Sequence, residues 1–181
     1  MKRLIASVGL LLLAALYLWS CEKDDICTSD TPTTASVVVN FYNKDNAEAL
    51  KTVTGLQYFV EGDPKIITID GSVSSIRVPL KVDATSTKWG FILKTTTNNV
   101  ERTNTDYLEF KYTTQQTYVS RACGYKTTFL LDKSIPGGER NPILSNGNVP
   151  SDATFWINSY RVEHDTIAIE NIEKPNVKIF F

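Results

Sequence analysis

Histidine is almost missing from this chain of 181 residues, which has one histidine, His164, and only three cysteines. Metal centres are built mainly from cysteine, histidine and carboxylate side chains, and no paired Cys-x-x-Cys spacing is present beside His164. The chain also lacks a Gly-x-Ser-x-Gly elbow, a glycine-rich phosphate loop and a His-Glu-x-x-His helix. The sequence therefore predicts no metal, no cofactor and no enzyme activity.

Two catalytic arrangements need no such motif. A Ser-His-Asp system would have to use His164, and we interpret that residue as a surface or turn histidine, because no nucleophile signature accompanies it. Glycoside hydrolysis needs two carboxylates at a suitable separation, which a sequence does not show. The acidic residues here are scattered, which is typical of solvated positions.

Neither sign of charge dominates the chain. Lysine and arginine together number 19 and the acidic residues 20, so the formal net charge is −1. Removing the first 20 residues would remove Lys2 and Arg3 and take the charge to −3. A mildly acidic chain has no electrostatic basis for binding nucleic acid or anionic lipid.

The N-terminal segment has the layout of a secretory signal. Lys2 and Arg3 precede an apolar run over residues 4–18, and Cys21 follows shortly after it. A cysteine at the cleavage point resembles the lipobox of bacterial lipoproteins. That resemblance implies cleavage before Cys21 and attachment of lipid to Cys21.

The alternative interpretation of this segment is a transmembrane anchor. A spanning helix needs about 20 apolar residues, whereas the run here has 15 and the charged residues 22–25 end it at once.

Trp19 departs from the usual lipobox, in which a smaller residue is commoner. The acidic stretch 22–25 resembles an export tag for surface lipoproteins; its simpler interpretation is a solvated tether.

These features predict the organisation of the chain. We expect a signal peptide over residues 1–20, a lipidated tether over 21–34 and one domain over 35–181. The expected location is the cell envelope, with the lipid anchored in the outer membrane on its periplasmic face or at the cell surface.

Two cysteines remain after Cys21. Cys27 and Cys123 form an even pair in an exported chain, which predicts a disulfide. Two free buried thiols are the alternative.

Alternation of apolar and polar residues predicts strands along most of the domain. Strands are expected at 37–42, 56–60, 67–69, 76–80, 89–93, 108–113, 118–131 (one bent strand or two short ones), 155–158, 160–164, 166–169 and 177–181. Residues 46–52 are expected to form one helical turn, and 135–152, rich in proline, glycine and asparagine, a long loop.

Many short strands separated by turn signals favour a sandwich or a barrel. We predict an all-β fold, a two-sheet antiparallel β-sandwich of immunoglobulin-like or related type. A closed barrel is the alternative; it would show more uniform strand spacing.

Two tryptophans bear on a carbohydrate role, which is the alternative function, and one triplet bears on modification of the chain itself. Trp89 and Trp156 are able to stack on sugar rings if they are exposed, although a tryptophan in an alternating strand is usually core. Asp165-Thr166-Ile167 resembles a bacterial O-glycosylation site, which makes Thr166 a candidate for modification.

Several short stretches together resemble one family. They are Asp24-Asp25-Ile26-Cys27, Thr33-Thr34, Phe41-Tyr42, Val78-Pro79-Leu80 and Val119-Ser120-Arg121-Ala122-Cys123-Gly124-Tyr125. In these the chain resembles the DUF6452 family of Bacteroidota lipoproteins, whose function is unknown. The resemblance implies no activity, and it supports Cys27 and Cys123 as partners.

We therefore expect a lipid-anchored envelope lipoprotein that acts as a non-enzymatic binding or envelope-structure module. A carbohydrate-binding or carbohydrate-active accessory is the alternative. A third hypothesis is docking on an outer-membrane protein through an exposed apolar patch or an unprotected edge strand, for example 177–181.

Overall fold

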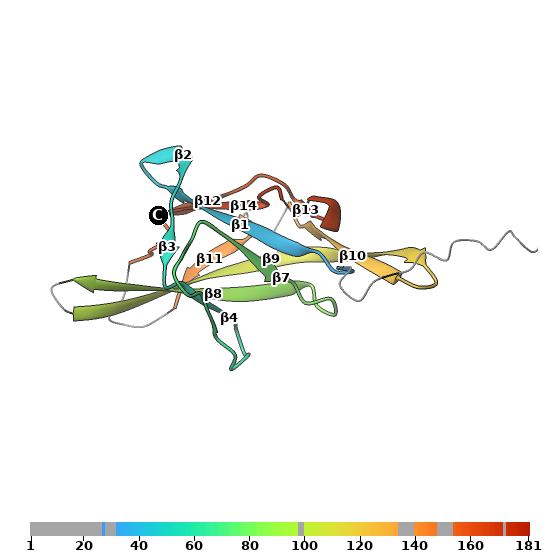
Figure 1. Ribbon diagram of the computed structural model, residues 1–181, viewed down its shortest axis with the longest axis horizontal. Helices are drawn as coiled ribbons and strands as arrows, with labels where there is room; N and C mark the ends of the chain where they lie inside the picture. The colour runs from blue at the N-terminus through green and yellow to red at the C-terminus, as the bar shows by residue number, and fades with distance from the viewer. Residues whose placement is uncertain (1–26, 28–31, 98–99, 134–139, 148–153, 172) are drawn as a thin grey trace, which may run out of the picture.

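The computed structural model covers most of the expected domain. It describes Cys27 and residues 32–97, 100–133, 140–147, 154–171 and 173–181 (Figure 1). The predicted signal peptide over 1–20, the lipidation site Cys21 and the acidic stretch 22–25 lie outside the described residues.

The larger of two main sheets has seven strands. Its order is β13-β10-β9-β8-β4-β5, and β11 pairs with β9 beside that path. The strands are β4 (Gln57–Val60), β5 (Ile67–Thr68), β8 (Ser86–Thr97), β9 (Val100–Ser120), β10 (Gly124–Leu131), β11 (Ile143–Asn146) and β13 (Thr166–Ile167).

The smaller main sheet has five strands, in the order β12-β14-β1-β2, with β7 also paired to β1. Its strands are β1 (Ser36–Asn43), β2 (Asn46–Leu50), β7 (Ser75–Pro79), β12 (Ser159–Val162) and β14 (Val177–Phe180). A short pair, β3 (Val53–Thr54) with β6 (Ser72–Val73), and a 3-10 turn, η1 (Ile169–Asn171), complete the described elements. Within the smaller sheet, β1 and β14 run parallel, with Val39 opposite Val177.

The core forms where the inward faces of the two sheets meet. Alternate residues of β1 are fully buried, as are alternate residues of β8 and β9. The largest fully buried side chains include Phe41, Phe91, Leu108, Phe110 and Tyr112. Burying one such side chain contributes about 1.5–3 kcal/mol. The predicted all-β fold with packed sheets is confirmed.

Residues 155–158 were expected to form a strand, and this prediction is wrong. Trp156 and its neighbour Ile157 are both buried, whereas successive residues of a strand point to opposite faces. The Trp156 indole donates to the carbonyl of Phe91 at 3.0 Å, and its ring lies 6.4 Å from that of Phe41. The segment therefore fills the space between the two sheets.

Three other sequence predictions need correction. Residues 46–52 do not form a helical turn, because 46–50 pair with the end of β1 as β2. The expected loop 135–152 contains β11, whose residues pair with β9 from Asp106 to Glu109. Residues 177–181 are not an unprotected edge, since β14 lies between β1 and β12.

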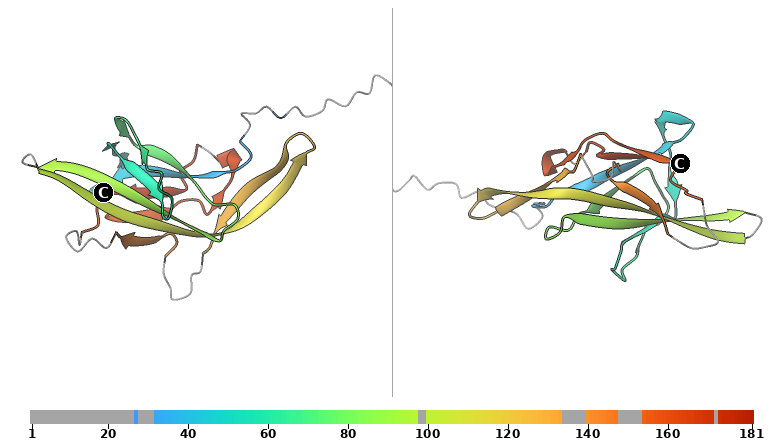
Figure 2. Two further views of the ribbon diagram at one scale, coloured as in Figure 1. Left: turned by 90° about the horizontal axis from the view of Figure 1, so that it is seen from below. Right: turned by 180° about the vertical axis from the view of Figure 1, so that it is seen from behind.

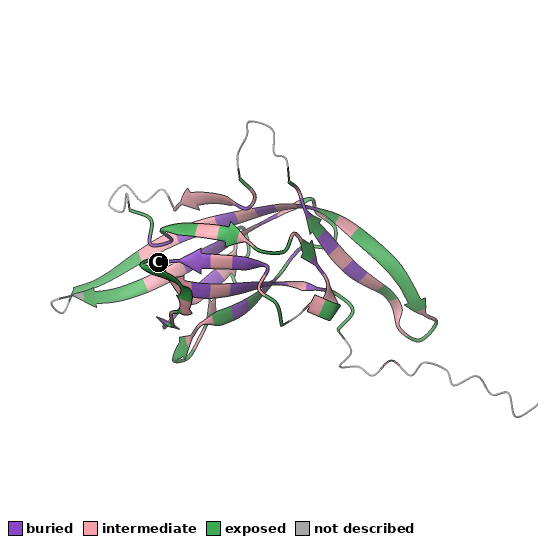
Figure 3. Ribbon diagram, turned by 90° about the horizontal axis from the view of Figure 1, so that it is seen from above, coloured by how far each residue is buried: buried purple, intermediate pink, exposed green. Residues whose placement is uncertain are grey.

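β9 is longer than the sandwich that it helps to build. Its first half pairs with β8 and its second half with β10, and the ends of these two hairpins project in opposite directions (Figures 1 and 2). Buried residues gather where the sheets overlap, while both projecting ends are largely exposed (Figure 3). We call residues 115–126 the β9–β10 arm. The expected segment 118–131 is therefore part of a hairpin.

A disulfide joins Cys27 to Cys123, with Cα atoms 5.1 Å apart, which confirms the predicted pair. Cys123 lies in the turn at the tip of the β9–β10 arm. After Cys27, residues 33–35 run alongside β10. The N–H of Thr127 donates to the carbonyl of Thr33 at 2.7 Å, and the carbonyl of Thr127 accepts from the N–H of Ala35 at 3.2 Å. The disulfide thus fixes the start of the described chain to the arm.

Replacing both Cys27 and Cys123 with serine is expected to lower the free energy of unfolding. The bond spans 96 residues of sequence, for which chain entropy predicts a stabilisation of at most about 4–5 kcal/mol. Urea denaturation of the oxidised protein and the double variant measures the difference. Equal midpoints would show that the bond does not restrict the unfolded chain.

Candidate functional site

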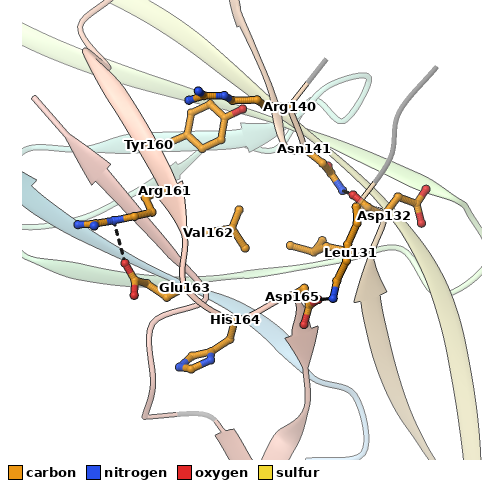
Figure 4. Close-up of a pocket in the computed structure, with 11 residues that line it drawn as sticks. Leu131, Asp132, Arg140, Asn141, Tyr160, Arg161, Val162, Glu163, His164 and Asp165 are labelled. Carbon is orange, nitrogen blue, oxygen red and sulfur yellow. Dashed lines mark hydrogen bonds and ion pairs between the residues drawn. The ribbon is translucent and has the colours of Figure 1, made fainter. Parts of the chain in front are cut away.

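A cavity of about 670 Å³ opens between the end of β10 and the connection from β12 to β13 (Figure 4). Its lining combines a few apolar side chains with charges of both signs. The lining residues are Leu131, Asp132, Lys133, Arg140, Asn141, Tyr160, Arg161, Val162, Glu163, His164 and Asp165.

Asn141 fixes one wall of this cavity. Its side-chain oxygen accepts from the N–H of Lys111 at 3.0 Å. Its amide nitrogen donates to the carbonyls of Lys111 at 2.6 Å and Asp132 at 2.9 Å. One asparagine therefore satisfies backbone groups where β9 and β10 separate, and it holds the returning chain there.

Asn176 fixes the opposite wall from inside the protein. It is buried, and its side-chain oxygen accepts from the N–H of Val38 in β1 at 2.9 Å. Its amide donates to the carbonyls of His164 and Thr166, each at 3.4 Å, and its own carbonyl accepts from Glu163 at 2.8 Å. The β12–β13 connection is thereby tied to β1.

Ion pairs occupy the rim of the cavity. Lys133 Nζ lies 2.8 Å from Asp165 Oδ2. This hydrogen bond holds the pKa of the Asp165 carboxyl below its usual value, and it raises the pKa of Lys133. Glu163 pairs with Arg161 at 3.0 Å and with Lys178 at 3.4 Å. The Lys133–Asp165 pair, whose lysine side chain is 81 % exposed, contributes little to stability.

The floor of the cavity is less polar. Leu131 is buried, and Val162 and Tyr160 are half-buried. Burial raises the pKa of the Tyr160 phenol, and the positive charge of Arg140 partly offsets this. Figure 4 shows Arg140 beside the Tyr160 ring. An apolar floor with a charged rim suits a small polar ligand.

The lining residues that the structure describes offer little for nucleophilic catalysis. They include neither serine, threonine nor cysteine. His164 does line the cavity, as an exposed residue at the end of the β12 wall, but its imidazole points away from Asp165 (Figure 4). The geometry therefore does not assemble a nucleophile with a base and its orienting acid among these residues.

The other candidates from the sequence do not line this cavity. Thr166 is exposed on β13, and its hydroxyl donates to Asp165 at 3.3 Å. Trp89 and Trp156 are both buried, so neither offers a face for sugar stacking.

Sequence reasoning missed the residues that shape this region. Asn141 and Asn176 lie in stretches whose asparagines indicate turns, and their long-range partners leave no local pattern. Asp106 is also fully buried, with Oδ2 accepting from Ile157 at 2.8 Å. The sequence did indicate that Asp106 is buried. It lies two residues before Leu108 and four before Phe110, so the alternation places all three on the same inward face of the strand.

Two other features are absent from the part of the chain that the structure describes. No group of three or more histidine, cysteine, aspartate or glutamate residues within these ranges is placed to hold a metal ion. No helix in the described part has the length and apolar character needed to span a membrane.

The fold and the cavity define a disulfide-tied, all-β protein. The model of a family of unknown function, DUF6452, matches residues 51–181, and the chain belongs to that family. The matched segment includes Val78-Pro79-Leu80 and the block around Cys123, while Cys27 and Phe41-Tyr42 precede it. No curated protein and no solved structure matches the chain.

Asn176→Ala is expected to destabilise the protein by about 1–3 kcal/mol, because the buried N–H of Val38 loses its acceptor. Asn46→Ala is the matched control. Asn46 accepts from Glu48 at an exposed site, where water replaces it, so a change within about 0.5 kcal/mol is expected. Chemical denaturation measures both. A loss no larger for Asn176→Ala than for the control would contradict this role.

Lys133→Met is expected to raise the pKa of Asp165 towards its usual value, because the hydrogen bond that lowers it is lost. A carboxyl group with a lowered folded-state pKa stabilises the fold above its unfolded pKa, and this contribution is lost as pH falls through the folded pKa. The stability difference between Lys133→Met and wild type should therefore disappear in acid.

Carbon-detected NMR titration of the Asp165 carboxyl measures this pKa. Lys126→Met is the control, because Lys126 pairs with Glu170 and its loss should raise the pKa of Glu170 instead. An Asp165 pKa that is the same in wild type and Lys133→Met would show that the ion pair does not form.

Proposed function

We propose that this protein is a lipid-anchored lipoprotein of the cell envelope, with its lipid on Cys21. The short apolar run that ends just before Cys21 supports lipidation. The single observation that carries the envelope assignment is the disulfide between Cys27 and Cys123. Structural disulfides persist in oxidising compartments outside the cytoplasm. The proposed membrane is the outer membrane, on its periplasmic face or at the cell surface.

Within the envelope, the proposed role is non-enzymatic, as a binding or envelope-structure module. The cavity at the β12–β13 connection supports a binding role, because an apolar floor under a charged rim orients a polar ligand. The glycan alternative loses its main support, since Trp89 and Trp156 are buried. Thr166 remains the proposed acceptor for O-glycosylation, and its exposure is compatible with modification.

Cys21→Ala is expected to abolish incorporation of labelled fatty acid and to leave the precursor uncleaved. The reason is that lipid is attached through the cysteine thiol, which alanine lacks. Metabolic labelling followed by electrophoresis measures both effects.

The matched control keeps Cys21 and replaces both Cys27 and Cys123 with serine. It should incorporate fatty acid, because it retains the thiol that carries the lipid. Labelling of Cys21→Ala at the wild-type level would contradict the proposed anchor.

A further inference from the structure

The tip of the β9–β10 arm carries an exposed pair of aromatic rings. Tyr118 is 54 % exposed and Tyr125 is 59 % exposed. Their ring centroids lie 5.5 Å apart in an edge-to-face arrangement. Val119, which follows Tyr118 in the chain, is 48 % exposed. Rings that pack on each other and face solvent leave an apolar surface for a partner.

Tyr118 and Tyr125 lie on the core-facing side of the larger sheet, at a point beyond the region where the two sheets pack. Tyr125 is opposite Tyr118 in the ladder, and two steps further along β10, Thr127 is opposite Gln116. Phe129 follows on the same face and is fully buried. Alternate residues of a strand share one face, so the tyrosines lie on the side that is apolar in the core. The smaller sheet does not cover them there, since both tyrosines are more than half exposed. The end of the arm is correspondingly drawn as largely exposed in Figure 3.

The charge on the arm also suits a lipid interface. The sequence has no acidic residue from Phe110 through Leu131. The cations of the arm are Arg121, in the tip turn, and Lys126, which pairs with Glu170. No carboxylate of the arm would therefore have to lose water at a membrane surface.

The opposite hairpin end, formed by β8 and β9, differs in these respects. Its sequence from Leu93 to Thr105 holds no aromatic residue, and Lys94 pairs with Glu101 at 3.6 Å. Its exposed apolar side chain is Val100, at 57 %. This end has comparable exposure without the aromatic pair, so it serves as an internal comparison.

The disulfide places the tyrosine tip near the proposed lipid. Six residue steps separate Cys21 from Cys27, and an extended chain covers at most about 22 Å over that number. The Cα atoms of Cys27 and Cys123 are 5.1 Å apart. The arm tip is thus held close to the anchored residue, while the β8–β9 end projects the other way (Figure 2).

We propose that the β9–β10 arm docks on the lipid surface, with Tyr118 and Tyr125 in the headgroup region of the bilayer. This inference rests on the proposed lipid anchor at Cys21. Tyrosine concentrates at membrane interfaces because its ring is apolar and its hydroxyl stays hydrated. The arm would then give the anchored domain a second contact with the membrane, which restricts its orientation.

The test uses Tyr125→Trp in the lipidated protein that begins at Cys21, mixed with phosphatidylcholine vesicles. Vesicles with brominated acyl chains quench tryptophan that enters the bilayer. The emission that Tyr125→Trp adds is expected to fall at least about twofold relative to unbrominated vesicles. Val100→Trp is the matched control, and its added emission should not change. Buried Trp89 and Trp156 give the same background in both variants.

Flotation of the vesicles separates the outcomes. Protein that floats with unquenched Tyr125→Trp overturns the docking and leaves the anchor standing. Equal quenching of Val100→Trp also overturns it, because the two ends would then contact lipid alike. Protein that carries no lipid and does not float overturns the proposed anchor, and the docking with it. If Tyr125→Trp fails to fold, Tyr118→Trp reports on the same ring pair.

Discussion

The length of β9 is the constraint on which the rest of this structure depends. Its 21 residues pair with β8, β10 and β11, so one strand organises the whole larger sheet. The middle of the strand supplies fully buried side chains at every second position, from Asp106 to Tyr112. Its two ends extend beyond the smaller sheet, and each becomes half of a projecting hairpin. The core and the arms are therefore consequences of one long, regular strand.

The disulfide turns one of these projections into a defined end of the molecule. Without it, the β9–β10 arm would have no covalent link to the start of the described chain. With it, the tip of the arm and Cys27 share one covalent connection. A lipid anchor on Cys21 would place the membrane at that end. The proposed lipid attachment at Cys21 would then lie close in sequence to Cys27, whose disulfide needs an oxidising compartment and ties the chain to the arm.

Much of the fold could be predicted from the sequence, because alternation is a local signal. The pattern around Phe41, Trp89 and Phe110 marked strands that exist, and the cysteine count marked the disulfide. The prediction of a helical turn at residues 46–52 was wrong because β2 forms by pairing with β1, and local propensity does not record that pairing. The interior position of β14 was missed for a similar reason, since its parallel partner β1 lies far away in sequence.

The cavity could not be predicted because its walls depend on long-range polar contacts. Asn176 is polar and adjacent to Pro175, a context typical of a loop, yet it is buried against β1. Trp156 was recognisable as a core residue, but its position between the two sheets was not. Its partners Phe41 and Phe91 come from β1 and β8, which lie far away in sequence. Sequence patterns show which residues are buried more readily than which distant backbone groups they satisfy.

The most direct test of this account is mass spectrometry of the protein extracted from the envelope and digested without reduction. We expect an N-terminal peptide that begins at Cys21, carries lipid, and is linked through Cys27 to the peptide that contains Cys123. A chain that retains residues 1–20, or free thiols at Cys27 and Cys123, would contradict it.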